Sequence, residues 1–377
     1  MADSSKDLQL RELKDMINDL KKMIKTLQAT VDAANKREEA LTQERDNLKE
    51  EVDLLRKKLF GSSSEKRSMD VPGQLNLFNE AELEQNPTIA EPEALESLLP
   101  ENLIYGISGV LYYSLNTHKI KEKTIYNMIN FLVELYQIKS HDWRSIIRYH
   151  IEKDKLVLAD EKVKYPKGCI NFGLAHGIIA PLIALAKAKK YGYNVKGINA
   201  TISGLRQLYE KYSIRDMNIL KYPTMLSVED YFSNTVSKDS ITYNAGWCYG
   251  NAGIVRGLMK VSYYLNDNNN YQYYKKELLS IINQELDNYN FDLPIVCHGY
   301  ASVLSIQISA FRESGDKSFL ITRERNMRQT IISHRNCIFN DEYTNDYSIL
   351  SGESGTILTL INGIYLSKEY PKLLMID

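Results

Sequence analysis

This sequence of 377 residues has few cysteines and no excess of charge of either sign. Its 47 lysines and arginines are balanced by 48 aspartates and glutamates, which argues against a global basic field that would hold nucleic acid. Four cysteines are too few for a disulfide framework in a chain of this length, so we expect free thiols or metal ligands. No apolar run reaches the roughly 18 residues of a transmembrane helix, and the N-terminus lacks the apolar core of a signal peptide. We therefore expect a cytoplasmic protein with no transmembrane segment and no nucleic acid partner.

The first hundred residues lack the residue types that are common in the rest of the chain. All 26 tyrosines, both tryptophans, all 6 histidines and all 4 cysteines follow residue 100, and only Gly61 and Gly73 of the 19 glycines precede it. This shift predicts three parts: residues 1–60, a linker over residues 61–96, and a domain over residues 97–377.

Residues 1–60 show a heptad repeat over about seven heptads, which is typical of a coiled coil. Neither proline nor glycine interrupts the repeat, and only Glu38 and Arg45 break its apolar pattern. β-Branched residues recur in one series and leucine dominates the other, which favours a parallel homodimer. The alternative is a long helix folded back on its own chain. The two series are Leu10, Ile17, Ile24, Val31, Glu38, Arg45, Val52, Leu59 and Leu13, Leu20, Leu27, Ala34, Leu41, Leu48, Leu55.

The linker contains glycine, serine, proline and acidic residues, which predicts a mostly flexible segment. Its apolar cluster Leu75–Phe78 is a candidate docking patch. The stretches Lys58–Arg67 and Gly73–Glu82 resemble the leader of the IS-sixty-six-type transposases. That resemblance covers about residues 1–85 and implies an oligomerising leader; the cysteine-rich segment and acidic core of such enzymes do not follow.

Helical periodicity dominates the domain over residues 97–377, so we expect an all-α fold. Short polar or glycine-containing breaks separate most of the expected helices. Those helices are Thr124–Tyr136, Ile179–Tyr191, Val195–Tyr212, Ile254–Leu265, Tyr271–Leu286 and Ser318–Ser333.

A short glycine-containing pattern recurs ahead of several apolar segments. Its glycines are Gly106, Gly177, Gly250, Gly299 and Gly352, separated by 71, 73, 49 and 53 residues. Such steps hold one or two helical hairpins, which predicts a repeat architecture whose turns face a common centre. For Gly106 and Gly352 we expect no role beyond a tight turn.

Three residues beside these turns form a candidate zinc site. Cys248 and Cys297 both stand two residues before a turn glycine, and His298 follows Cys297. Zinc prefers thiolate and imidazole ligands, and catalytic sites leave one of its four positions open. Cys169 and Cys337 lack any ligand pattern and are expected to be ordinary buried thiols.

The motifs around these residues, taken together, resemble the lanthipeptide cyclase (LanC-like) family. The motifs are Tyr165–Gly168, Asn171–Gly177, Trp247–Gly253 and Cys297–Gly299, and the resemblance covers about residues 100–377. It implies an α/α toroid with a central zinc ion held by Cys248, Cys297 and His298. It also implies that His176 is the acid/base histidine and that Tyr249 stands beside the metal.

The reaction implied by this resemblance adds a peptide cysteine to a dehydroalanine or dehydrobutyrine of the same precursor. The product is a lanthionine or methyllanthionine thioether ring. The chemistry fits these residue types, because an open zinc position lowers the pKa of a thiol and an imidazole can move the proton. The implied partners are a dehydrated precursor peptide, a dehydratase and a transporter.

The sequence departs from that family in three ways. Asn102 stands where the family usually has an aspartate that pairs with the histidine, and Asn244 stands where it usually has an arginine. The third departure is length: the family's toroid normally has more helical layers, whereas only five repeat turns are visible in this sequence. This predicts an incomplete toroid that lacks N-terminal layers and has an apolar edge.

These departures leave three functions open besides a cyclase. The first alternative is a non-catalytic peptide-binding scaffold, formed by fusing a transposase leader to a truncated cyclase domain. A transposition-related DNA-binding protein is the second, and balanced charge disfavours it. A zinc prenyltransferase shares the toroid, but an aspartate would be expected among its zinc ligands.

Overall fold

The computed structural model describes residues 106–117, 120–141, 144–339, 346–366 and 374–377. The described residues all lie in the second of two compact units, Ala90–Asp377. The predicted coiled coil, the linker and Asn102 lie outside the described residues. The described helices are α3 (Ile107–Ser114), α4 (Glu122–Glu134), α5 (Ala159–Lys164), α6 (Ile179–Lys190), α7 (Ile198–Lys211), α8 (Val228–Ser233), α9 (Asn251–Tyr264), α10 (Asn268–Ile282), α11 (Tyr300–Ser314), α12 (Arg323–Phe339) and α13 (Glu353–Tyr365).

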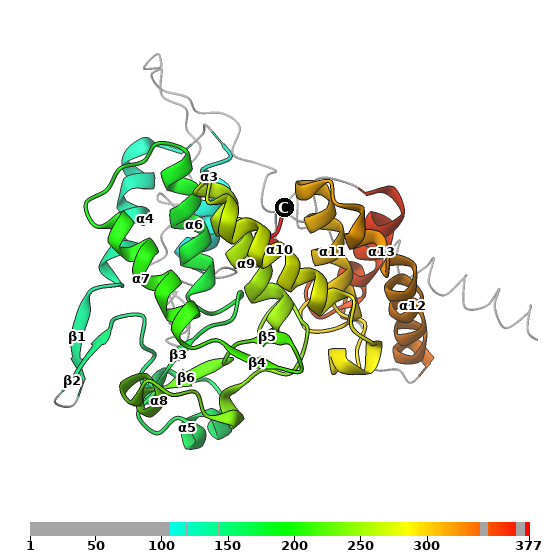
Figure 1. Cartoon of the computed structure of the whole chain (residues 1–377), viewed down its shortest axis with the longest axis horizontal. Helices are drawn as coiled ribbons and strands as arrows, with labels where there is room; N and C mark the ends of the chain where they lie inside the picture. Colours follow the sequence, from blue (N-terminus) through cyan, green and yellow to red (C-terminus); the bar gives the residue numbers. More distant parts are fainter. Residues whose placement is uncertain (1–105, 118–119, 142–143, 340–345, 367–373) are drawn as a thin grey trace, which may run out of the picture. The chain divides into compact units, whose positions relative to one another are not determined.

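Helices that follow one another pack in pairs, α3 with α4, α6 with α7, α9 with α10 and α11 with α12 (Figure 1). The first members of three pairs, α6, α9 and α11, are buried over most of their length. Their partners bury one face only. In α7, for example, Ile198, Ile202, Leu205 and Tyr209 are buried, a spacing that places them on one side of a helix. Three layers therefore have a buried inner helix and an amphipathic outer helix.

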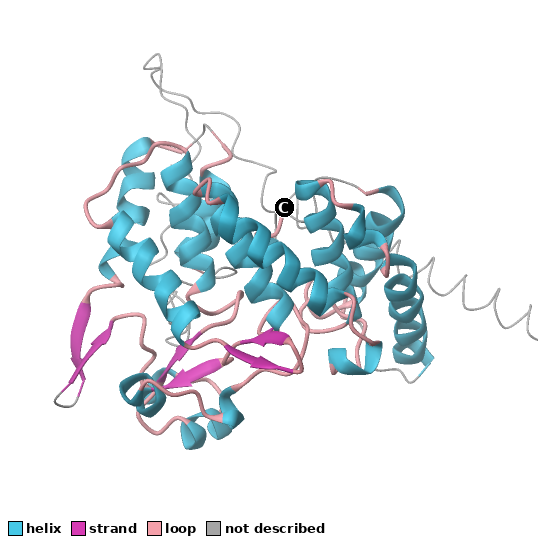
Figure 2. Ribbon diagram, viewed as in Figure 1, coloured by secondary structure: helices cyan, strands magenta, loops and turns pink. Residues whose placement is uncertain are grey.

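The described part is mostly helical, in agreement with the expected all-α fold, and it also has short strands that were not predicted. It contains three two-stranded antiparallel sheets: β1 (Ile138–His141) with β2 (Arg144–Ile147), β3 (Cys169–Asn171) with β6 (Met225–Ser227), and β4 (Ile214–Asp216) with β5 (Ile219–Lys221). Strands β3 to β6 lie at one end of the helix pairs (Figure 2). Strands of 3 or 4 residues are too short to show alternation in a sequence. Short 3₁₀ helices complete the fold at Lys153–Lys155, Lys238–Ser240, Leu286–Tyr289 and Lys317–Leu320.

The predicted helices correspond to observed ones, with shifts at their ends. The end regions of α4, α6 and α7 agree within a few residues, whereas α9 begins at Asn251 rather than Ile254. The largest shift is in the segment predicted as Ser318–Ser333, where a 3₁₀ turn precedes α12. The Asp316 side chain accepts the N–H of Ser318 at 3.0 Å and so caps that turn.

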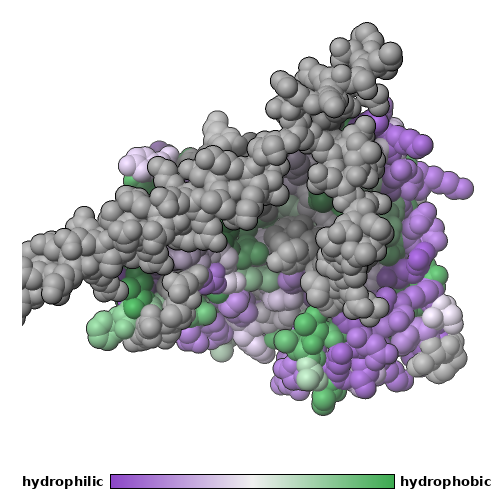
Figure 3. Space-filling view, turned by 180° about the vertical axis from the view of Figure 1, so that it is seen from behind, coloured by the Kyte–Doolittle hydropathy of each residue, from purple (hydrophilic) through white to green (hydrophobic). Residues whose placement is uncertain are grey.

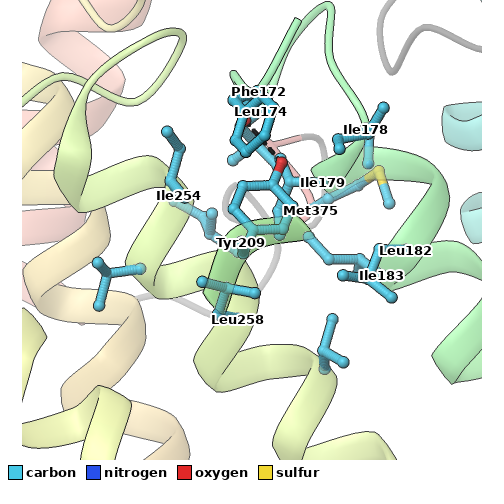
Figure 4. Packing of buried hydrophobic residues seen from close by; sticks show 14 of the residues in the cluster. Phe172, Leu174, Ile178, Ile179, Leu182, Ile183, Tyr209, Ile254, Leu258 and Met375 are labelled. Atoms are coloured by element: carbon cyan, nitrogen blue, oxygen red, sulfur yellow. Dashed lines mark hydrogen bonds between the residues drawn. The ribbon is translucent and has the colours of Figure 1, made fainter. Parts of the chain in front are cut away.

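One large apolar cluster joins the inner helices, and Figure 4 shows part of it around α6 and α9.

Cys169 and Cys337 are buried, as predicted, and burial raises the pKa of the Cys169 thiol to about 12. On the face that Figure 3 shows, the coloured residues include hydrophilic ones and patches of hydrophobic ones. Among the described residues, no helix has the length and apolar character needed to cross a membrane.

Helix α13 has an exposed apolar stripe. Ile357, Ile361 and Ile364 follow the helical spacing along one face and are all exposed. The sequence predicts an apolar edge of this kind for a toroid that lacks N-terminal layers. The number of layers stays a prediction, because residues 1–105 lie outside the described part.

Candidate functional site

Four glycine turns of the repeat share one backbone hydrogen bond. In each, the residue after the glycine donates its N–H to the carbonyl seven residues earlier in the chain. The four bonds are Ile178 to Asn171 (2.9 Å), Asn251 to Asn244 (3.1 Å), Tyr300 to Leu293 (3.1 Å) and Glu353 to Asp346 (2.9 Å). The glycines themselves are the N-cap residues of α9, α11 and α13, and Gly106 is that of α3. The predicted repeat is thus a repeated backbone geometry.

A side-chain oxygen closes three of these turns. Asn171, Asn244 and Asp346 each accept the N–H of the residue two positions later, at 2.9, 3.0 and 2.9 Å respectively. Such Asx turns stabilise a tight bend through a local bond between a side chain and the backbone. The position at which the family usually has an arginine therefore has a structural role here, because Asn244 stabilises the Cys248 turn.

Backbone hydrogen bonds also connect the turns to one another. Ala175 donates its N–H to the carbonyl of Cys248 (3.4 Å), Cys248 donates to Cys297 (3.0 Å), and Cys297 donates to Leu350 (2.9 Å). These four residues occupy equivalent positions, each two residues before a turn glycine. The connection places Cys248 and Cys297 side by side, although they are far apart in the sequence.

The two cysteines and His298 are in contact. The Cys248 thiol and a ring N–H of His298 both donate hydrogen bonds to the sulfur of Cys297. The bond from Cys248, together with that from His298, lowers the pKa of the Cys297 thiol to about 5, against the effect of burial. The same pair of bonds raises the pKa values of Cys248 and His298. Of the two thiols, that of Cys297 therefore has the lower pKa.

His176 and Tyr249 lie beside this group and stack on each other. Their ring centroids are 5.7 Å apart with an interplanar angle of 29°. Burial lowers the pKa of His176, and the nearby Cys297 partly offsets that effect. Burial also raises the pKa of Tyr249, whose hydroxyl is hydrogen-bonded to Asn171. All five residues predicted for the site thus lie at neighbouring turns.

Gly173 allows this close approach. A β-carbon at Gly173 would stand 2.7 Å from the carbonyl oxygen of Cys248 and 2.7 Å from the Tyr249 ring. Neither distance is tolerable for a real side chain, so only glycine fits between the two turns. The motif Asn171–Gly177 therefore packs directly on the turn that carries Cys248.

The donor set fits zinc by its chemistry, since two sulfurs and one imidazole are preferred zinc ligands. Cys297 is the middle member of the three, since it is hydrogen-bonded to Cys248 and also to His298. Among the described residues, no group of three or more His, Cys, Asp or Glu side chains has the geometry needed to hold a metal ion. His298 is exposed, and its ring is hydrogen-bonded to Cys297.

Two further residues, Asn171 and Trp247, lie at this site and had no predicted role. Asn171 bonds both the Gly173 N–H and the Tyr249 hydroxyl. Its signal was available, because an Asx residue stands six positions before Gly177, Gly250 and Gly352 alike. Trp247 is fully buried beside Cys248 and bonds a residue near the end of the chain, for which no local signal exists.

Comparisons with known proteins agree with this arrangement. The family model described as "Lanthionine synthetase C-like protein" matches residues 12–375. The chain is similar to the nisin biosynthesis protein NisC of Lactococcus lactis subsp. lactis, with 28% identity over 218 residues, which are 56% of this chain and 50% of NisC. The chain thus spans about half the length of that curated relative.

A solved structure named nisin cyclase resembles the fold. The TM-score is 0.64 at 24% identity, and the match covers 75% of this chain and 68% of that chain. At this identity the likeness is evidence for the fold alone, which is the helical toroid architecture. The family match begins at residue 12 and so runs through the segment that resembles a transposase leader; the comparisons give that second resemblance no support.

Proposed function

Because the chain belongs to the lanthionine synthetase C-like family, we propose that it is a zinc-dependent lanthionine cyclase. The substrate is a dehydrated precursor peptide that contains a cysteine and a dehydroalanine or dehydrobutyrine. The reaction forms a bond between the cysteine sulfur and the β-carbon of the dehydro residue. The thiol proton leaves the sulfur and a proton is delivered to the α-carbon, so the reaction involves no net oxidation or reduction.

One observation carries this proposal. Equivalent residues of neighbouring turns are hydrogen-bonded, and this places the sulfurs of Cys248 and Cys297, the His298 imidazole and the stacked pair His176–Tyr249 together. Zinc bound by Cys248, Cys297 and His298 would supply a Lewis acid that lowers the pKa of a substrate thiol.

The protein's own residues perform the remaining tasks. His176 lies near Cys297 and is the group that can take up or deliver a proton at the reacting atoms. Tyr249 stacks on the His176 ring, and Asn171 bonds the Tyr249 hydroxyl, so the orientation of the imidazole is fixed from one side. The half-buried position of His176 limits water around its ring.

Metal analysis tests the ligand assignment. We expect the purified protein to contain about one zinc per chain, and Cys297→Ala to lose it. Cys337→Ala is the matched control, since it removes a buried thiol of α12 outside the site. Stoichiometric zinc in Cys297→Ala, or none in the unmodified protein, would contradict the assignment.

Ring formation on a dehydrated precursor peptide tests the activity. Free thiol should disappear with the unmodified protein, and His176→Phe should lose at least about a hundredfold of the rate while it keeps its zinc. A His176→Phe variant that cyclises at the normal rate would remove that residue from the mechanism.

A non-catalytic peptide-binding scaffold is the second candidate. The observation that favours it is Asn244, whose side-chain oxygen is occupied by the Gly246 N–H where the family usually supplies a positive charge. A protein that binds zinc and the precursor peptide but leaves every thiol free would select this function over the cyclase.

A further inference from the structure

The segment Leu374–Asp377 is buried among the inner helices. Leu374, Met375 and Ile376 are at most 2% exposed, and Figure 4 shows Met375 among apolar side chains of α6 and α9. Buried backbone groups outside an α-helix or a strand need hydrogen-bond partners from elsewhere in the fold. The bonding partners of this segment therefore indicate what it does.

Polar side chains of three helices hold the segment. Arg256 of α9 donates from Nε (3.2 Å) and from Nη2 (2.8 Å) to the carbonyl of Ile376. The Ser309 hydroxyl of α11 donates to the same carbonyl, and Lys260 donates to the backbone oxygen of Asp377. Tyr112 of α3 donates to the Asp377 carboxylate. Helices α3, α9 and α11 thus meet on these four residues.

The charges in this cluster also favour docking of the segment. Arg256 and Lys260 are buried, and both pair with Glu313, at 2.9 Å and 2.7 Å. Because two buried cations share one buried carboxylate, these three side chains have a net positive charge. Asp377 and the carbonyl oxygens of the segment face this positive charge, so they complete the cluster.

The same segment is bonded to the candidate site. Trp247 is fully buried and donates its indole N–H to the carbonyl of Leu374 at 3.0 Å. The backbone of Trp247 packs against Gly253 in the first turn of α9, and Cys248 follows it directly. Trp247 is therefore held by α9 through its backbone and by the segment through its indole N–H.

We propose that the segment Leu374–Asp377 is a positioning element for the Cys248 turn. It fixes the Trp247 ring, and through it holds the Cys248 thiol in register with Cys297. The inference rests on the proposed function in so far as that function makes Cys248 a zinc ligand. The positional claim itself concerns the thiol, and it is measurable on metal-free protein.

Alkylation of Cys248 tests the position without any metal. The unmodified chain, treated with a chelator, is reacted with iodoacetamide, and the rate at each cysteine is followed by peptide mass spectrometry. Trp247→Phe removes the bond to Leu374 and keeps an aromatic ring. We expect it to raise the alkylation rate of Cys248 about tenfold, since that rate follows local opening of the turn.

Two further variants separate positioning from general loss of stability. Tyr149→Phe is the matched control, because it deletes a buried side-chain bond to a backbone carbonyl, that of Leu132, in a different part of the fold. It should leave the Cys248 rate unchanged. Ser309→Ala removes a hydroxyl that bonds Ile376 and Arg256, at the end of the segment away from Trp247. A faster Cys248 reaction in this variant would be transmitted through Leu374–Asp377. Equal Cys248 rates in all four proteins would overturn the proposal.

Cobalt(II), used as a spectroscopic probe in place of zinc, relates the position to ligand binding. We expect Trp247→Phe to weaken cobalt binding and alter the sulfur-to-cobalt absorption, and Tyr149→Phe to match the unmodified protein in both. Unchanged cobalt binding and absorption in Trp247→Phe would also overturn the proposal. If the unmodified protein binds neither cobalt nor zinc, the zinc proposal fails, and the alkylation rates still decide the positioning role.

Discussion

At the scale of single residues, an Asx side chain shapes each of three site turns. Asn171, Asn244 and Asp346 use one oxygen to bond the backbone two residues later. This bond bends the chain so that the residue two positions before the glycine can reach the neighbouring turn. The placement of Cys248 therefore depends on both Asn244 and Gly250.

Substitution of Asn244 should show this dependence. Asn244→Ala leaves the Gly246 N–H without its acceptor, and we expect a loss of about 1–2 kcal/mol in the free energy of unfolding. Urea denaturation of the two proteins measures the difference. Asn244→Asp is the control, because Asp346 makes the equivalent bond in its own turn. A loss as large in Asn244→Asp as in Asn244→Ala would refute the Asx role.

The sequence was informative at this scale only where the pattern is local. The register of Cys248 and Cys297 relative to their turn glycines could be read directly, and both thiols lie together in the structure. The relation of His176 to Tyr249 followed only from the family resemblance. That relation needs two turns to pack face to face, and no spacing along the chain encodes such packing.

At the scale of elements, the close packing of α6 on α9 depends on Gly257. A β-carbon at Gly257 would stand 2.5 Å from Cγ1 of Ile179 and 3.2 Å from Cδ1 of Ile183. Both side chains are fully buried in α6. The two inner helices therefore have no space for an additional methyl group at this point.

Alanine at position 257 should destabilise the protein although alanine favours helices. The clash should cost about 1–3 kcal/mol, which exceeds the helix propensity gain of about 1 kcal/mol. Thermal unfolding followed by circular dichroism measures the difference. Gly363→Ala in α13 is the control, since its nearest neighbour is the flexible end of Met327, at 3.1 Å. If both variants are equally stable, α6 and α9 are not closely packed here.

The ion pairs between α9 and α11 should make stability depend on acidity. Burial alone would raise the pKa of Glu313, but Arg256 and Lys260 outweigh it and lower the pKa to about 2. A depressed carboxyl pKa stabilises the fold above the unfolded value of about 4.5. We expect this contribution to be lost as the pH falls from about 4.5 towards 2.

Glu313→Gln should flatten that part of the pH profile. It should also lower stability at neutral pH by about 3–5 kcal/mol, because two buried cations lose their carboxylate. Denaturant unfolding between pH 2 and pH 7 provides the measurement. Glu324→Gln alters an exposed pair on α12 and should retain the profile of the unmodified protein. An unchanged acid slope in Glu313→Gln would rule out this carboxylate as its source.

At the scale of the whole molecule, the heptad repeat of residues 1–60 predicts a homodimer. Leu20→Asp together with Leu27→Asp places charges in the predicted seam and should give a monomer. Sedimentation velocity on the full chain measures the change. Glu12→Ala, at a polar position outside both apolar series, should leave the dimer intact. A monomeric unmodified protein would favour a helix folded back on its own chain.

The sequence by itself determined the helical repeat, the register of its turns and the identity of the candidate zinc ligands. These features are encoded within a few residues: a glycine, a cysteine two positions before it and an apolar helix after it. The short strands and the exact start of α12 were missed, because strands of 3 or 4 residues have too little periodicity and a cap displaced the helix.

Only the tertiary structure decided how the site is supported. Trp247 and Leu374 are 127 residues apart, and Arg256 and Ile376 are 120 residues apart, yet both pairs are hydrogen-bonded. Nothing near Leu374 in the sequence marks it as a partner of the Cys248 turn. Such contacts arise because buried polar groups must find bonding partners once the apolar helices pack, and the packing determines which groups meet.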